Sequence, residues 1–293
     1  MTALLPILLL LVQAVISVHT ELVAVPVVVT DGYGQRVSDL RPESFQVYDE
    51  GRPQPIVVFD HGDAPVTLGL VVDRSQSMRM KMPALVVAVS ALLHASRSDD
   101  ELFAVDVNDR VSLALADAVP FTHDADALET ALVAVPTEGR TALYDGLAVG
   151  LRHLQLGHAE KRVLIVVSDG GDNASQRTYN DVLALARQSN AVIYAIGLLG
   201  TSPVQEDEDA GLLKRLCRDT GGLAYFPRTL EEVAATATEL ARELREQYTL
   251  GFTPTDRRGG PVFRRIEVRV AATGHGRLHV RTRAGYLAGD GTP

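Results

Sequence analysis

Residues 67–77 read TLGLVVDRSQS, an apolar run of strand length that ends in a cluster of polar side chains. Two later runs, Val163–Val167 and Ala191–Ile196, are just as short and just as apolar. A strand that is apolar on both faces must be covered on both faces. Segments with helical spacing of apolar residues follow or precede these runs: Met82–Leu93, Thr141–Leu156, Tyr179–Gln188, Ala210–Thr220 and Leu230–Gln247. The alternation predicts an α/β fold with a mostly parallel sheet between two helical layers.

One strand of this sheet is predicted to run the other way. Glu101–Asp106 and Val111–Leu115 have strand character, and only the turn at 108–110 separates them. A parallel neighbour would need a crossover connection of a dozen or more residues. We therefore expect Val111–Leu115 to be an antiparallel strand at the edge of the sheet.

In both flanks of the α/β segment, the sequence pattern is typical of short strands separated by turns. The N-terminal strands are expected at Leu22–Val29, Phe45–Tyr48 and Ile56–Phe59, and the C-terminal ones at Tyr248–Phe252, Phe263–Val270 and Leu278–Thr282. Either flank alone has too few strands for a stable unit. We expect residues 21–63 and 248–293 to pair into a small β-unit beside an α/β domain at 64–247.

Composition excludes several classes of protein. The chain has 293 residues, 46% of them hydrophobic and 22% charged, so it can bury a full core and is not disordered as a whole. Its net charge of −9 makes it a poor binder of polyanions, and we expect no nucleic-acid partner. Cys217 is the single cysteine, which excludes an internal disulfide and a cysteine-rich zinc site.

The N-terminus is predicted to be a secretory signal peptide. Ala3–Val18 is an apolar stretch without charge, too short for a membrane span, which needs about 20 residues. Ala14 ends a plausible cleavage site, so the signal peptide is placed at 1–14, extending to about 20 at most. No later segment is long and apolar enough to span a bilayer. We expect a secreted, periplasmic or cell-envelope protein with no membrane span in the mature chain.

Polar clusters follow three of the predicted elements. Asp73–Ser77 follows the first apolar strand, Gly139–Thr141 begins a helix, and Ser168–Gly170 follows Val163–Val167. Ligand sites of parallel sheets lie at the carboxyl ends of the strands, so these clusters are expected to meet. They offer carboxylate and hydroxyl oxygens, which Mg²⁺ prefers; Mn²⁺ and Ca²⁺ are alternatives.

The mixture of residue types has a chemical consequence. If hydroxyl groups bind the ion directly and the two carboxylates act partly through water, the ion keeps an electron deficit. It can then accept one more carboxylate from another molecule. Ordinary helix capping by Asp and Ser is the simpler alternative for each cluster taken alone.

These clusters resemble the metal-ion-dependent adhesion site of von Willebrand factor type A (VWA) domains. The matching positions are Asp73, Ser75, Ser77, Thr141 and Asp169, and the resemblance extends from about Val66 to Glu246. It implies a Rossmann-like fold, a bound divalent ion, usually Mg²⁺, and a protein ligand whose Asp or Glu completes the shell of the ion. The flanking sequences, Phe45–Gly51 and Gln247–Phe252 among them, resemble the secreted bacterial VWFA-related family of acidobacterial type.

We expect no enzymatic activity. The sequence has no Gly-x-Ser-x-Gly elbow and no His-Glu-x-x-His motif. An aspartyl phosphatase would want a second Asp at the position of Ser75. Two alternatives to an adhesion module remain. The first is an assembly component of an envelope complex, in which the metal only stabilises the fold. The second, less favoured, is a magnesium-dependent hydrolase.

Several other polar residues are interpreted as structural. Asp145 is expected in the first turn of a helix and Asp172 in a loop, with a supporting role at the metal as the alternative for Asp172. The acidic run at 206–209 is expected to be a solvated helix entrance, because it lacks the spacing of a calcium loop. Cys217 is expected in the core.

Overall fold

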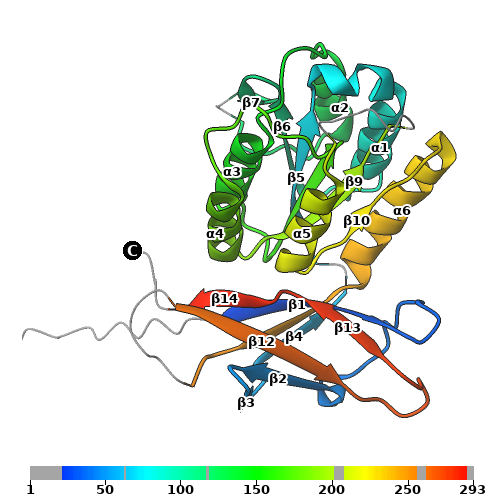
Figure 1. Ribbon diagram of the computed structural model, residues 1–293. Coiled ribbons are helices and arrows are strands. Elements are labelled where there is room, and N and C mark those ends of the chain that lie inside the picture. The colour runs from blue at the N-terminus through cyan, green and yellow to red at the C-terminus, as the bar shows by residue number, and fades with distance from the viewer. Residues whose placement is uncertain (1–21, 63, 117–118, 201–207, 256–261, 289–293) are drawn as a thin grey trace, which may run out of the picture.

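The computed structural model describes residues 22–62, 64–116, 119–200, 208–255 and 262–288. The predicted signal peptide lies outside these residues. The chain forms an α/β unit that stands on a unit of two antiparallel sheets (Figure 1). None of the helices in the described part of the chain is long and apolar enough to cross a membrane.

The α/β unit is built on a six-stranded sheet with the order β10-β9-β8-β5-β6-β7. The strands are β5 (Val66–Asp73), β6 (Glu101–Val107), β7 (Val111–Leu113), β8 (Lys161–Ser168), β9 (Val192–Gly197) and β10 (Ala224–Tyr225). Every pairing is parallel except that of β6 with β7, which is antiparallel at the sheet edge. Both expectations for this sheet are confirmed.

Helices cover the two faces of the sheet because successive residues of its strands point to opposite sides. Leu70 and Val72 of β5 pack toward α1 (Met82–His94), α2 (Ala125–Val133) and α6 (Leu230–Glu246). Val71 packs toward the other layer, which consists of α3 (Leu143–Leu154), α4 (Tyr179–Ser189) and α5 (Ala210–Thr220). All eight residues of β5 are buried, as expected for a strand whose central residues 68–72 are all apolar.

Helix α2 was not expected from the sequence. It begins after Asp124, whose side chain accepts a hydrogen bond from the backbone of Ala127, and it buries Leu128 and Leu132. The sequence signal for this helix is an N-capping Asp followed by leucines four and eight residues later, at helical spacing.

The flanks form two four-stranded antiparallel sheets, each with strands from both ends of the chain. One has the order β13-β1-β11-β4, with β1 (Val23–Thr30), β4 (Val58–His61), β11 (Tyr248–Phe252) and β13 (His279–Thr282). The other has the order β14-β12-β2-β3, with β2 (Phe45–Asp49), β3 (Arg52–Gln54), β12 (Val262–Val270) and β14 (Gly285–Ala288). One apolar cluster draws on both sheets. The predicted pairing of the flanks is confirmed.

Arginine side chains join the β-unit to the α/β unit. Arg36 forms ion pairs with Glu239 and Glu246 of α6. Arg281 of β13 lies 2.5 Å from Glu243 of the same helix, measured between Nη2 and Oε1. The two units therefore pack through charged contacts to α6.

Candidate metal centre

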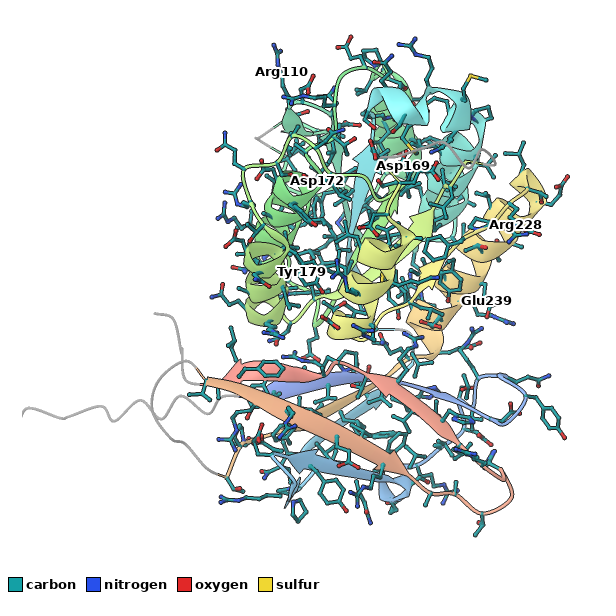
Figure 2. All side chains as sticks on the ribbon, viewed as in Figure 1. Arg110, Asp169, Asp172, Tyr179, Arg228 and Glu239 are labelled. Atoms are coloured by element: carbon teal, nitrogen blue, oxygen red, sulfur yellow. The ribbon has the colours of Figure 1, made fainter. Side chains whose placement is uncertain are left out.

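The candidate site lies at the carboxyl ends of β5 and β8. These strands are neighbours, yet the chain leaves β5 toward α1 on one face and leaves β8 toward α4 on the other. In parallel sheets, ligand sites lie at such a point of divergence. Asp73 is the last residue of β5, and Asp169 directly follows β8. Asp169 lies in the α/β unit, well away from the two antiparallel sheets (Figure 2).

Asp73 is fully buried and held by two donors. Its Oδ1 accepts a hydrogen bond from the backbone of Ser75 at 2.9 Å, and its Oδ2 accepts one from the Ser168 hydroxyl at 2.6 Å. Burial raises the pKa of Asp73 to about 6, although both serines oppose the shift, and the negative charge of Asp169 adds to it. The carboxylate is therefore held in place by two uncharged donors.

The two serines after Asp73 place their hydroxyls side by side. The Oγ atoms of Ser75 and Ser77 are 3.0 Å apart. Ser75 is buried, and Ser77 lies in the short 3-10 helix η2 (Gln76–Lys81) that leads into α1. The extended backbone of Ser75 followed at once by the 3-10 turn brings the alternate side chains of 75 and 77 to one side.

The loop that contains Thr141 is joined to both neighbouring loops by hydrogen bonds. The backbone of Gln76 donates to the carbonyl of Gly139 at 3.0 Å, which ties the first loop to the second. The backbone of Thr141 donates to Asn173 Oδ1 at 2.9 Å, and the backbone of Asn173 donates to the Thr141 carbonyl at 3.0 Å. The structure thus brings together the three loops that contain the five predicted residues.

Gly139 makes the approach of the second loop possible. Its φ is +75°, and a Cβ at this position would lie 2.3 Å from Asp109 Oδ2. The same Asp109 side chain accepts a hydrogen bond from the backbone of Arg140 at 3.0 Å, so it cannot move away without loss. Glycine is required here both for the backbone conformation and for the space.

We predict that Gly139→Ala lowers the free energy of unfolding by about 1–3 kcal/mol. The measurement is chemical denaturation of the metal-free protein. Gly274→Ala is the matched control, because Gly274 also has a positive φ but has open space around it. Equal destabilisation by the two substitutions would show that backbone strain alone matters and that the contact with Asp109 does not.

Lys81, which was not expected at the site from the sequence, contacts Asp169 and also contacts Glu208. The ammonium of Lys81 lies 2.9 Å from Asp169 Oδ2 and 2.6 Å from Glu208 Oε1. The side chain of Glu208 is 13% exposed, so the expectation of a solvated acidic run is wrong for this residue. Asp209 caps α5 by accepting from the backbone of Leu212 at 2.7 Å, and residues 206 and 207 lie outside the described residues. No local pattern in the sequence links Lys81 with Glu208.

Asp172 and Asp145 hold the third loop against α3. Asp172 Oδ2 accepts from the backbone of Tyr144 at 2.9 Å and from the Ser175 hydroxyl at 2.6 Å. Asp145, in the first turn of α3, accepts from the backbone of Gln176 at 2.8 Å. Hydrogen bonds from the loop, that of Gln176 first, lower the pKa of the Asp145 carboxyl despite its partial burial. Both carboxylates therefore act as structural acceptors.

The donor set fits a hard divalent cation. The three loops supply two carboxylates and three hydroxyls, and Mg²⁺ takes oxygen ligands of this kind. The raised pKa of Asp73 is the mark of a buried carboxylate without enough positive charge nearby. Ser75, Ser77 and Thr141 would offer neutral oxygens to the ion, and Asp73 and Asp169 would balance its charge.

Other groups capable of chemistry lie elsewhere. Cys217 is buried in the core as expected, and burial raises the pKa of its thiol far above the usual range. His94 lies near Asp126 and Glu129, where α1 meets α2, but the His94 and Asp126 side chains are 54% and 86% exposed. Because this cluster is so exposed to solvent, water would compete with it for a bound ion, and it is a poor candidate for a metal site.

Comparisons with known proteins identify the same α/β unit. The sequence model of the von Willebrand factor type A domain matches residues 68–240, more than half of the chain. A von Willebrand factor type A structure from Catenulispora acidiphila is 13% identical with a TM-score of 0.55, over 86% of this chain and 76% of that chain. No functionally curated protein matches the chain.

Two further structures share the fold at low identity. Proximal thread matrix protein 1 from the mussel byssus is 17% identical with a TM-score of 0.53, over 67% of this chain and 51% of that chain. The pilus adhesin SpaC from Lactobacillus rhamnosus GG is 11% identical with a TM-score of 0.50, over 88% of this chain and 49% of that chain. At such identities the likeness concerns the fold alone.

Proposed function

This chain belongs to the von Willebrand factor type A domain family, and on that premise we propose that it is a metal-dependent protein-binding module. Domains of this family generally bind protein partners through a divalent ion. In this chain we assign the ion, Mg²⁺, to Asp73, Ser75, Ser77, Thr141 and Asp169. The partner presents an Asp or Glu side chain to the site.

One observation carries the proposal. Two buried carboxylates lie at the ends of neighbouring strands: Asp73 is the last residue of β5, and Asp169 directly follows β8. The paired hydroxyls of Ser75 and Ser77 lie in the loop between β5 and α1. Asp73 is engaged by Ser75 and Ser168 through both oxygens, which suits a carboxylate that balances charge from behind the ligands. The hydroxyls would then face the ion, which supplies an electron-deficient centre when bound. The chain's own part is to orient these oxygens and to leave a position for the partner's carboxylate.

The site is placed favourably for a partner. Asp169 lies far from the β-unit, which therefore does not cover the site (Figure 2). We further propose that residues 64–247 form the binding domain and that 21–63 with 248–293 form its β-unit. The N-terminal apolar stretch supports export, to the cell envelope or beyond, and the flanks support membership of the acidobacterial-type VWFA-related group. No residue arrangement on these loops supports a nucleophile with an activating base, so we propose a non-enzymatic role.

Two measurements test the proposal. Titration calorimetry of metal-free protein with MgCl₂ should give one binding site. Capture of proteins from the culture medium and envelope fraction should yield a partner with Mg²⁺ that is lost with EDTA. Magnesium binding without any metal-dependent partner would favour the alternative, in which the ion only staples the fold of an assembly component.

We predict that Thr141→Ala weakens partner binding more than it weakens magnesium binding. The substitution removes one neutral oxygen and leaves both carboxylates, so most of the attraction for the ion remains. We expect magnesium affinity to fall by less than about tenfold and partner binding to be lost at equal metal occupancy. Calorimetry gives the first value, and capture at saturating Mg²⁺ gives the second.

Thr130→Ala, an exposed threonine on α2, is the matched control for this experiment and should change neither value. If Thr141→Ala binds the partner as tightly as the unmodified protein does, Thr141 is not part of the binding machinery.

A further inference from the structure

Lys81 introduces a positive charge into the candidate metal centre. It is the last residue of η2, eight residues after Asp73 on the loop that also contains Ser75 and Ser77. Its side chain is 10% exposed, and its ammonium makes close contacts with two carboxylates. The chain has only three lysines against 25 arginines, so a lysine is an uncommon cation in this protein.

The two carboxylates that hold Lys81 have different surroundings. Asp169 is buried, with its side chain 1% exposed, and its Oδ1 accepts from the backbone of Gly171 at 3.3 Å. Glu208 lies just before α5, and its Oε1 also accepts from the backbone of Gly200 at 2.7 Å. Asp169 belongs to the site, whereas Glu208 belongs to the segment that leads into α5. Lys81 therefore bridges the site and a neighbouring loop.

We propose that Lys81 is a built-in cation that competes with the divalent ion for Asp169, and that Glu208 retains the ammonium when the ion binds. This inference rests on the proposed function, because it concerns regulation of the same site. Lys81 partly neutralises the site in metal-free protein. A divalent ion bound near Asp169 repels the ammonium, so one of the two must give way.

The competition has a functional consequence. It lowers magnesium affinity, because every binding event includes the displacement of an ion pair that is largely shielded from solvent. It also makes the position of Glu208 sensitive to the occupancy of the site, because the released ammonium keeps Glu208 as its partner. The metal centre is thereby coupled to one of the surface loops around it.

The first test measures magnesium affinity by titration calorimetry. Lys81→Met keeps the length of the side chain and removes its charge. We expect its dissociation constant for Mg²⁺ to be at least about tenfold lower than that of the unmodified protein. Lys214→Met is the matched control, because Lys214 lies over the Phe226 ring and its removal changes the net charge equally. It should leave the affinity unchanged.

The second test needs no substitution. Acetylation of the unmodified protein by an amine-selective reagent, followed by peptide mass spectrometry, measures the accessibility of each lysine. Lys81 should react slowly in EDTA and several-fold faster in saturating Mg²⁺. Lys214, which is exposed, provides the internal standard and should react at the same rate in both.

The outcomes separate this inference from the proposed function. If magnesium binds but Lys81→Met has the same or a weaker affinity, or if Lys81 labelling does not respond to Mg²⁺, the competition is refuted and the metal site stands. If neither the unmodified protein nor Lys81→Met binds magnesium, the proposed function fails, and the inference fails with it.

Discussion

Asp73→Asn should abolish magnesium binding and at the same time stabilise the metal-free protein at neutral pH. The amide keeps the shape of the side chain, can accept from the backbone of Ser75 and can donate to the hydroxyl of Ser168, so both observed contacts can be preserved. It lacks the charge that an ion needs. We expect magnesium affinity to fall by at least about a hundredfold.

The gain in stability follows from the pKa of Asp73. Burial raises this pKa to about 6 in the folded, metal-free protein, above the value of an unfolded Asp, which is about 4. Protonation of Asp73 therefore favours the folded state. As the pH rises from about 4 to about 6, the contribution of Asp73 to the free energy of unfolding becomes less favourable. Above that range the unmodified protein bears the full cost of a buried charge, and the Asn variant does not.

Chemical denaturation in EDTA at several pH values tests this prediction. The variant should be more stable by roughly 2 kcal/mol at pH 7, and the difference should vanish near pH 4. Saturating Mg²⁺ should stabilise the unmodified protein and leave the variant unaffected. Ser44→Ala, in the β-unit, serves as a substitution remote from the site. A variant that is less stable than the unmodified protein at pH 7 would mean that the charge of Asp73 is well compensated without metal.

Deletion of residues 248–293 should unfold the N-terminal flank, residues 21–63. The deletion removes β11, which lies between β1 and β4, and β12, which pairs with β2. Tyr248, Leu250 and Phe252 of β11 are each fully buried, and each such side chain contributes about 2–3 kcal/mol. This loss exceeds what a small β-unit can withstand, since a whole domain is stable by only about 5–15 kcal/mol.

Hydrogen exchange of the truncated protein measures this effect. Backbone amides of β1 and β2 should lose their protection, whereas those of β5 should keep it because its partners β6 and β8 remain. The β5 amides thus act as the internal control for folding of the α/β unit. If β1 stays as protected as in the full chain, the two flanks do not depend on each other for stability.

Local sequence patterns predicted most of the architecture of the α/β unit, although not helix α2. Runs that are apolar at every position predict strands covered on both faces, and β5, with all eight residues buried, confirms this. The short turn at 108–110 predicted an antiparallel edge strand, which β7 confirms. Polar clusters after the strands were expected to meet, because the carboxyl ends of parallel strands lie at one edge of a sheet. The loops of Asp73, Thr141 and Asp169 do meet there.

The identity of distant partners was decided only by the tertiary structure. Lys81 and Glu208 are separated by 127 residues, and the buried pair of Arg264 and Asp49 by 215. The sequence shows several arginines in the C-terminal strands, but it does not show that Arg264 is buried against Asp49. Periodicity and capping act over a few residues and can be recognised locally. Which charge meets which depends on sheet order and register, and these are set by the packing of the whole chain.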